Sequence, residues 1–267
     1  MKIYHLTIHP NIPTETAWEE LEAAGVEVLY SDEDPEGRQK ILICRLEDHT
    51  SRVEQMAALP GILSISAAPD LMIDWETQWS QHGLDFHNGL VHVHVGETEF
   101  SLKPGPGFGD ASHPTTRLVL QMMKTSVPER NVLDIGCGSG ILSLAAIYLK
   151  AHSVYAIDID PDAIRHTIEN IGLNNIEQPI WVGSTDELID QCPAKPLIAL
   201  MNMISSEQEQ AWKALEPIHH QIQECITSGI LAEEKNAYIA HWAKRGWQLK
   251  KEEQEGCWQA FHFSKKG

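Results

Sequence analysis

Three glycines at alternate positions separate two apolar runs, a spacing typical of a nucleotide-binding turn. They are Gly136, Gly138 and Gly140, within the sequence Val-Leu-Asp-Ile-Gly-Cys-Gly-Ser-Gly at 132–140. The apolar residues before them predict a buried strand, and residues 141–150, apolar nearly all round, predict a buried helix. A strand, a glycine turn and a helix let a nucleotide-like ligand approach bare backbone at the helix N-terminus.

A carboxylate downstream of the turn indicates which ligand this would be. Asp158 ends a second predicted strand and lies 22 residues after Gly136, where nucleotide-binding sheets present an acid to ribose hydroxyls. The dinucleotide fingerprint G-x-G-x-x-G would need a further glycine at position 141, which is Ile141. Because ribose recognition is present without the diphosphate spacing, we predict S-adenosylmethionine rather than NAD.

The alternative for the acidic pair after this strand is that both residues only cap the following helix. Asp160 directly precedes Pro161, and proline is favoured at the first helical position. We therefore predict Asp160 as the N-cap, and Asp158 as free to bind the ligand.

Residues 104–116 form a second unusual stretch, Pro-Gly-Pro-Gly-Phe-Gly-Asp-Ala-Ser-His-Pro-Thr-Thr, with three glycines and three prolines in 13 residues. Such conformational restriction, with His113, Thr115 and Thr116 leading into a predicted helix, is typical of a loop that covers a ligand. The alternative is a structural turn in which a threonine caps the helix.

Metal and disulfide chemistry have weak support in the sequence. His92 and His94 would share one face of a predicted strand, but we find no carboxylate or third ligand at a familiar spacing, and we predict no metal site. The five cysteines, at 44, 137, 192, 225 and 257, include no C-x-x-C pair and predict neither a disulfide framework nor a zinc site.

The composition limits the possible partners. A formal net charge of −18 repels phosphate backbones, so we expect no direct nucleic-acid binding, whereas a basic protein substrate would be attracted. No apolar run is long enough to span a bilayer, and the first residues resemble no signal peptide. We expect a cytoplasmic monomer that does not bind membranes.

The chain divides into two unequal parts by pattern. Residues 1–68 follow the order β-α-β-β-α-β of a ferredoxin-like α+β domain, contain no chemical motif, and have 12 acids against 5 Lys and Arg; we predict a substrate-recognition domain. Residues 69–82 predict a linker helix that contains Trp75 and Trp79. Residues 83–267 alternate strands with helices and end in two strands, which predicts an α/β domain with a mostly parallel sheet and an antiparallel C-terminal hairpin.

Four segments together resemble one family, the PrmA methyltransferases, which methylate large-subunit ribosomal protein eleven. They are P-G-x-x-F-G…H-P-T-T at 104–116, V-L-D-I-G-C-G-S-G-I-L at 132–142, D-I-D-P at 158–161, and Asn202 at a predicted strand end. The predicted front domain and linker fit as well, so the resemblance extends over the whole chain. It implies a Rossmann-like class I methyltransferase domain that uses S-adenosylmethionine on a basic ribosomal protein.

The resemblance also implies site residues. Carried over by position, Thr116, Gly136, Asp158 and Asn202 would contact S-adenosylmethionine, and we include Gly138 of the same turn. The chain departs from the family in two places. Asp110-Ala111 replaces the usual Thr-Gly, which stiffens and charges the loop, and Met-Ile rather than Ile-Leu follows Asn202.

The predicted reaction needs a neutral amine, either lysine side chains or an N-terminal α-amine. An α-amine is neutral about one time in ten at pH 7, and a lysine far more rarely. No general base stands out in the sequence, so the catalytic residues are unassigned. Asn202 could orient the amine, and His113 could assist or be structural. Two alternatives remain open: methyl transfer to another acceptor, and a cofactor-binding assembly protein without catalysis.

Overall fold

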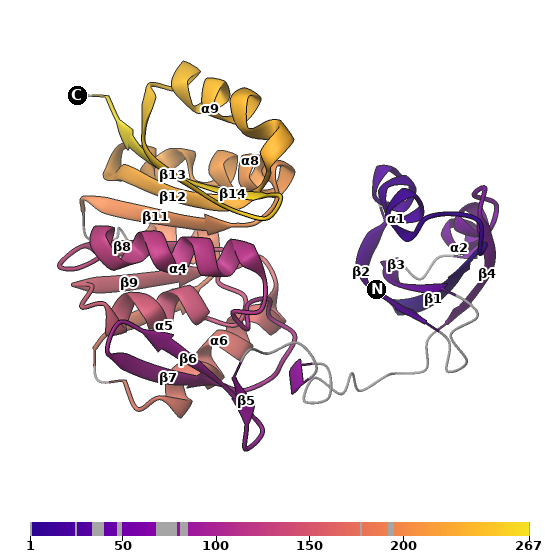
Figure 1. The fold of residues 1–267 in the computed structure, drawn as a ribbon, viewed down its shortest axis with the longest axis horizontal. Helices are drawn as coiled ribbons and strands as arrows, with labels where there is room; N and C mark the ends of the chain where they lie inside the picture. The colour runs from indigo at the N-terminus through magenta and orange to yellow at the C-terminus, as the bar shows by residue number, and fades with distance from the viewer. Residues whose placement is uncertain are drawn as a thin grey trace. The chain divides into compact units, whose positions relative to one another are not determined.

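The computed structural model describes residues 2–24, 26–33, 40–46, 50–67, 79–80, 85–176, 178–191 and 195–266. The chain separates into two compact units, Met1–Ile73 and Asp74–Gly267, and each is described by itself (Figure 1). Only Trp79 and Ser80 of the predicted 69–82 linker helix lie within the described residues.

The first unit has the predicted order β-α-β-β-α-β. Its elements are β1 (Lys2–Ile8), α1 (Thr14–Ala23), β2 (Glu27–Glu33), β3 (Lys40–Leu46), α2 (Thr50–Ala57) and β4 (Ile62–Ala67). The strands form one antiparallel sheet in the order β2-β3-β1-β4. Alternate residues of β1, Tyr4, Leu6 and Ile8, are buried with Leu21 of α1 and Met56 of α2, so one face of the sheet packs on the two helices.

The second unit is built on a seven-stranded sheet in the order β10-β9-β8-β11-β12-β14-β13. The strands are β8 (Asn131–Ile135), β9 (Ser153–Ile157), β10 (Ile180–Gly183), β11 (Leu197–Asn202), β12 (Ile222–Leu231), β13 (Trp247–Glu255) and β14 (Trp258–Lys265). The first five are parallel, and β14 and β13 add an antiparallel hairpin, which confirms the predicted fold class.

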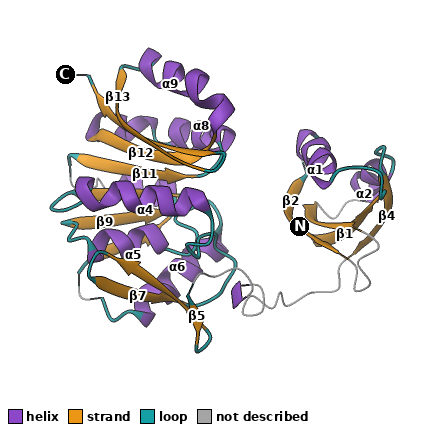
Figure 2. Cartoon of the chain, in the orientation of Figure 1, coloured by secondary structure: helices purple, strands orange, loops and turns teal. Residues whose placement is uncertain are grey.

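Helices cover both faces of this sheet (Figure 2). One face packs on α4 (Pro114–Ser126), α5 (Ile141–Tyr148) and α6 (Pro161–Leu173), and the other on α7 (Thr185–Gln191), α8 (Ser205–Ala214) and α9 (Lys235–Lys244). A three-stranded sheet, β5 (Phe86–His87), β6 (Leu90–Val95) and β7 (Thr98–Leu102), packs beside α5 and α6. Short 3-10 helices, η1 (Glu216–Gln221) and η2 (Ala232–Glu234), flank β12.

The inward face of α6 differs from the expectation. The apolar periodicity predicts that Ala163, Ile164, Ile168 and Ile171 point inward. Ala163 is buried and Ile171 packs against the core, but Ile168 is 52% exposed. The buried side chains of α6 include the polar His166, Thr167 and Asn170. This face contacts loop backbone, whose N–H and C=O groups need polar partners, so polar residues are buried in preference to isoleucine.

Two further findings bear on the chain's chemistry. Within the described residues, no helix is long and apolar enough to cross a membrane. Cys44, Cys137, Cys225 and Cys257 are free thiols, and Cys192 lies outside the described residues. Burial raises the pKa of the Cys44, Cys137 and Cys225 thiols, which leaves them protonated and unreactive.

Candidate active site

The glycine turn lies at the carboxyl edge of the parallel sheet, directly after the central strand β8. The neighbours of β8 are β9 on one side and β11 on the other, and ligands of open α/β sheets bind at such a reversal of strand order. Gly136, Gly138 and Gly140 all have positive φ, at 73°, 55° and 82°. The predicted turn therefore has a backbone that other residues adopt only with strain.

Asp158 follows β9 and closes against this turn. Its Oδ2 accepts a hydrogen bond from the Gly138 N–H at 3.1 Å, and its Oδ1 accepts one from the Asp160 N–H at 3.0 Å. Each carboxylate oxygen keeps a lone pair for a further donor, such as a ribose hydroxyl. Asp160 is the N-cap of α6 and accepts from the Asp162 N–H at 2.9 Å, as predicted from Pro161.

Asn202 and Thr116 meet on the other side of the turn. Side chains alternate along β11, so Asn202 points to the face that carries α4, where its Nδ2 donates to the Thr116 Oγ1 at 3.1 Å. Thr116 is fully buried in the first turn of α4. The Asn202 Oδ1 is buried and has no hydrogen-bond partner, so an acceptor is left available for a ligand N–H.

Asp134, which the sequence reasoning did not assign, is a second buried acceptor at this edge. It is 1% exposed, two residues before Gly136 in β8, and its Oδ2 accepts from the Ser143 hydroxyl of α5 at 2.6 Å. Its Oδ1 has no partner. Burial raises the pKa of this carboxyl to about 7. An acid inside an otherwise apolar strand just before the glycines was the signal that could have identified it.

The loop of residues 104–112 lies against the glycine turn. Phe108 O accepts from the Ser139 N–H at 3.0 Å, and a Cβ added to Gly107 would come within 2.3 Å of the Gly138 carbonyl. Two side chains of α6 also hold the glycine turn. Thr167 donates to Gly138 O at 3.0 Å, and Asn170 donates to Ser139 O at 2.8 Å. The loop and the turn therefore form one hydrogen-bonded unit.

His166 fixes this loop through both ring nitrogens. Nδ1 accepts from the Gly107 N–H at 3.0 Å, and Nε2 lies 2.7 Å from Lys103 O. A carbonyl only accepts, so Nε2 carries the hydrogen and the imidazole is neutral. Burial lowers the pKa of His166, which keeps this neutral form at pH 7.

We expect acid to release the loop. The pKa of His166 in the folded protein is below the ordinary value of 6.5, so its stabilising contribution is complete above about pH 6.5 and is lost as the pH falls further. Protonation would place an N–H on Nδ1 opposite the Gly107 N–H. Hydrogen exchange at Gly107, corrected for intrinsic pH dependence, should accelerate as the pH falls below 6.5. His166→Gln, whose amide also offers one acceptor and one donor, should remove that pH dependence; an unchanged profile in this variant would contradict the assignment.

His113 has a structural role at the start of α4. It is the N-cap residue, and its Nδ1 lies 2.8 Å from the Thr115 Oγ1 and 3.4 Å from the Thr115 N. Its ring packs edge-on against Phe108 and Trp258, at centroid distances of 5.7 and 5.1 Å. Burial, with the nearby Arg117, lowers the pKa of His113. The cap is therefore a histidine rather than the threonine considered from the sequence.

Ala111, at the position where the resemblance predicts glycine, leaves strain in the loop. Ala111 has φ +65°, a left-handed conformation that costs an L-residue about 1–2 kcal/mol. Ala111→Gly should relieve this cost, but glycine loses about 0.5–1 kcal/mol more in chain entropy on folding. The free energy of unfolding should therefore rise by about 0.5–1 kcal/mol. Urea denaturation followed by tryptophan fluorescence would measure it. In the exposed helical control Ala240→Gly, the same change should lower stability by about 1 kcal/mol.

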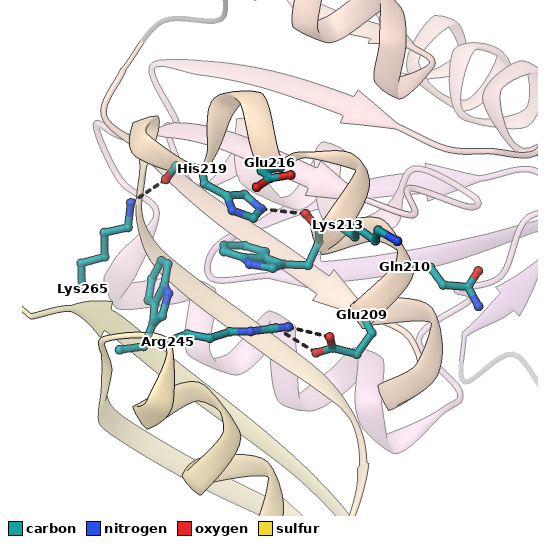
Figure 3. Close-up of a pocket in the computed structure, with 9 residues that line it drawn as sticks. Glu209, Gln210, Lys213, Glu216, His219, Arg245 and Lys265 are labelled. Carbon is teal, nitrogen blue, oxygen red and sulfur yellow. Dashed lines mark hydrogen bonds and ion pairs between the residues drawn. The ribbon is translucent and has the colours of Figure 1, made fainter.

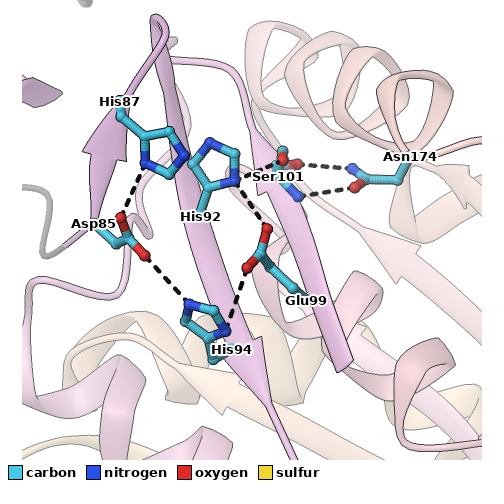
Figure 4. A network of polar contacts seen from close by, with 7 residues as sticks. All are labelled: Asp85, His87, His92, His94, Glu99, Ser101 and Asn174. Carbon is cyan, nitrogen blue, oxygen red and sulfur yellow. Dashed lines mark hydrogen bonds and ion pairs between the residues drawn. The ribbon is translucent and has the colours of Figure 1, made fainter. Parts of the chain in front are cut away.

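The two histidines of the predicted strand belong to a polar network on β5–β7 (Figure 4). His94 lies between Asp85 and Glu99, with nitrogen–oxygen distances of 3.2 and 3.4 Å, and His92 Nδ1 lies 3.1 Å from Glu99. His87 stacks on His92 at 3.7 Å and pairs with Asp85. The fold thus supplies carboxylates that sequence spacing did not suggest. No group of three or more such residues within the described segments has the arrangement of a metal site.

A hollow of about 630 Å³ lies between α8, η1, α9 and the start of β13 (Figure 3). Its charged and polar groups largely pair with one another. Arg245 donates two hydrogen bonds to Glu209, at 2.8 and 2.6 Å, and Lys265 donates to His219 O at 2.5 Å. Because η1 precedes β12, this hollow is at the amino edge of the sheet, away from the glycine turn.

The residues at the carboxyl edge fit S-adenosylmethionine. Two buried acceptors without partners, Asp134 Oδ1 and Asn202 Oδ1, suit a ligand that carries positive charge and N–H donors. Gly136 has no side chain to collide with Met203, whose Cε is 2.5 Å from the place a Cβ would occupy. Asp158 offers a carboxylate for ribose. No basic side chain that could grip a diphosphate occurs in the glycine turn.

The parallel sheet with its antiparallel hairpin, and the glycine turn after its central strand, define a class I methyltransferase fold. Residues 86–266 match the family described as ribosomal protein L11 methyltransferase (PrmA). This match spans more than half of the chain, and the chain belongs to that family.

Individual relatives agree. The chain is 35% identical over 185 residues to the ribosomal protein L11 methyltransferase of Methylococcus capsulatus, covering 66% of this chain and 62% of that one. It is 37% identical over 208 residues to the enzyme of the same name from Enterococcus faecalis, with coverage of 72% and 64%. The match thus spans less than two thirds of either relative. A crystal structure of ribosomal protein L11 methylase from Lactobacillus delbrueckii subsp. bulgaricus superposes with a TM-score of 0.53 at 27% identity, covering 62% of this chain and 84% of that one.

Proposed function

We propose that this protein transfers methyl groups from S-adenosylmethionine to amines of a ribosomal large-subunit protein. The observation that carries the proposal is the set of acceptors around the glycine turn: Asp158 on one side, Asn202 with Thr116 on the other, and buried Asp134 beneath. The name of the family supports a ribosomal protein as acceptor. The net charge of −18 supports a basic one.

In this proposal the chain's residues bind, orient and exclude water. Thr116, Gly136, Gly138, Asp158 and Asn202 hold the methyl donor, which when bound supplies an electrophilic methyl group. The buried Asn202 Oδ1 can accept from the attacking amine and align its lone pair, and placement of this kind supplies most of the rate. A desolvated site also lowers the pKa of an amine, which increases its neutral, nucleophilic fraction.

Mass spectrometry with isotope-labelled S-adenosylmethionine and purified large-subunit proteins tests the function. We expect added methyl groups on one basic protein, and their loss with Asp158→Ala. Calorimetry with S-adenosylmethionine and NAD tests the cofactor separately, since tight NAD binding without binding of the methyl donor would overturn the assignment. Donor binding without any methylated product would favour the assembly protein over the enzyme.

The front unit is proposed to hold the protein substrate. Residues 1–68 have an acidic balance and no chemical motif, while the acceptors described above all lie in the second unit. Deleting residues 1–68 should therefore leave donor binding intact and abolish methylation of the protein. Unchanged turnover would contradict this division. We further propose a cytoplasmic monomer. Because a net charge of −18 repels phosphate backbones, we propose that it does not bind nucleic acid directly.

A further inference from the structure

The turn that carries Asn202 is held by a side chain from the helix that follows it. Gln208 lies in α8 and is 3% exposed. Its Nε2 donates to Met203 O at 2.8 Å and to Ser228 O at 2.9 Å. Both amide hydrogens are thus used, and they join the chain after β11 to β12.

A tyrosine from α9 sets the direction of this amide. Tyr238 is 7% exposed, and its hydroxyl donates to the Gln208 Oε1. With Oε1 held there, Nε2 must face the two carbonyl groups. Arg245 and Glu209 join the same two helices at the surface, which keeps α9 in place relative to α8 (Figure 3).

The turn at 202–204 has little room to move. Gly229 has φ +89°, and a Cβ added there would lie 2.2 Å from Met203 O. On the other side, the Met203 side chain lies over Gly136 of the glycine turn. Met203 directly follows Asn202 in the chain. A shift of the Met203 carbonyl group would therefore also move the side-chain amide of Asn202.

We propose that Gln208 and Tyr238 are positioning residues that aim the Asn202 Oδ1 at the site of methyl transfer. This proposal rests on the proposed function for its kinetic consequence. Its structural part, that the Gln208 amide sets the Asn202 side chain, stands without it. Neither residue faces the glycine turn, so both act through the turn at 202–204.

The isosteric variant Gln208→Glu tests the relay, because an ionised carboxylate would face two carbonyl oxygens in a buried position. At lower pH the carboxyl group introduced at position 208 becomes neutral and regains one hydrogen-bond donor. The displacement of the Asn202 side chain should therefore lessen on acidification. Gln210→Glu is a matched control, since Gln210 is exposed on the same helix and the change in charge is the same. Tyr238→Phe removes only the hydroxyl and should have a smaller effect in the same direction.

The first measurement uses the full chain without ligand. The Asn202 side-chain amide resonance, assigned by its loss in Asn202→Asp, should shift in Gln208→Glu and move back toward its wild-type position as the pH falls. It should stay in place in Gln210→Glu. An unmoved resonance in folded Gln208→Glu would overturn the proposal. If that variant does not fold, Tyr238→Phe decides by the same criterion.

Kinetics provide the second measurement. We expect Gln208→Glu to lower kcat at least about 10-fold while the Kd for S-adenosylhomocysteine changes less than about threefold. Asp158 and the glycine turn, which hold most of the cofactor, are unaffected, whereas the displaced Asn202 Oδ1 alters the reacting geometry. Equal losses in kcat and affinity, or none, would refute a positioning role. Wild-type protein that binds no methyl donor would instead refute the proposed function, and the resonance test would still stand.

Discussion

Replacing Asp158 by alanine should weaken binding of S-adenosylmethionine by at least about 100-fold. A carboxylate that accepts two ribose hydroxyls makes charge-assisted hydrogen bonds worth about 1.5–3 kcal/mol each, and both would be lost. The same change removes the acceptor of the Gly138 N–H and so loosens the glycine turn. Titration calorimetry at pH 7.5 would measure the affinity directly.

Asp162→Ala is the appropriate control for this prediction. Asp162 lies four residues further on and forms an ion pair with Arg165 on the exposed side of α6. An exposed pair of this kind contributes about 0–1 kcal/mol, so donor affinity should change less than about threefold. Wild-type affinity in Asp158→Ala would show that the ribose is bound elsewhere.

Asp134→Asn should make the ligand-free protein more stable at both pH 5 and pH 8, and the gain should be clearly larger at pH 8. Burial raises the pKa of Asp134 to about 7 from an ordinary value of 3.8. A carboxyl whose pKa is raised on folding contributes stability below about pH 3.8, and this contribution is lost as the pH rises to about 7. The ionised form therefore costs on the order of 4 kcal/mol above pH 7, most of which the amide avoids. Urea denaturation at the two pH values would measure the difference.

The same variant should bind the methyl donor poorly. A positively charged ligand beside the buried Asp134 Oδ1 favours the carboxylate and lowers its pKa, so binding should release up to one proton near pH 6.5. Calorimetry in two buffers of different ionisation enthalpy would detect this proton. Asp134→Asn should release none and bind at least about 10-fold more weakly. Proton release that persists in this variant would assign it to another group.

These opposite effects have one physical cause. A buried acceptor without a partner destabilises the empty protein, and it becomes favourable only when a ligand supplies the missing donor or charge. Asp134 and Asn202 both have this property at the carboxyl edge. Sites of this kind are expected where a fold trades stability for binding.

The glycine turn and Asp158 could be predicted from the sequence because their geometry is local. Positive φ at Gly136, Gly138 and Gly140 depends on neighbouring residues, and Asp160 caps α6 because Pro161 follows it. The sheet was also predictable, since its buried strands are short apolar runs between glycines and helices. The inward face of α6 was not, because hydropathy gave no reason to bury His166, Thr167 and Asn170.

By itself, the sequence determined the two-part organisation, the class of fold and the glycine turn for which we propose ligand binding, since all three depend on residues close together in the chain. Only the tertiary structure decided which polar groups hold Asn202 and the turn at 202–204. Gln208 and Tyr238 are 30 residues apart and Asn202 and Thr116 are 86 apart, and neither pair follows any periodic pattern. Their partners are backbone carbonyls and buried amides, whose positions exist only once the helices have packed on the sheet.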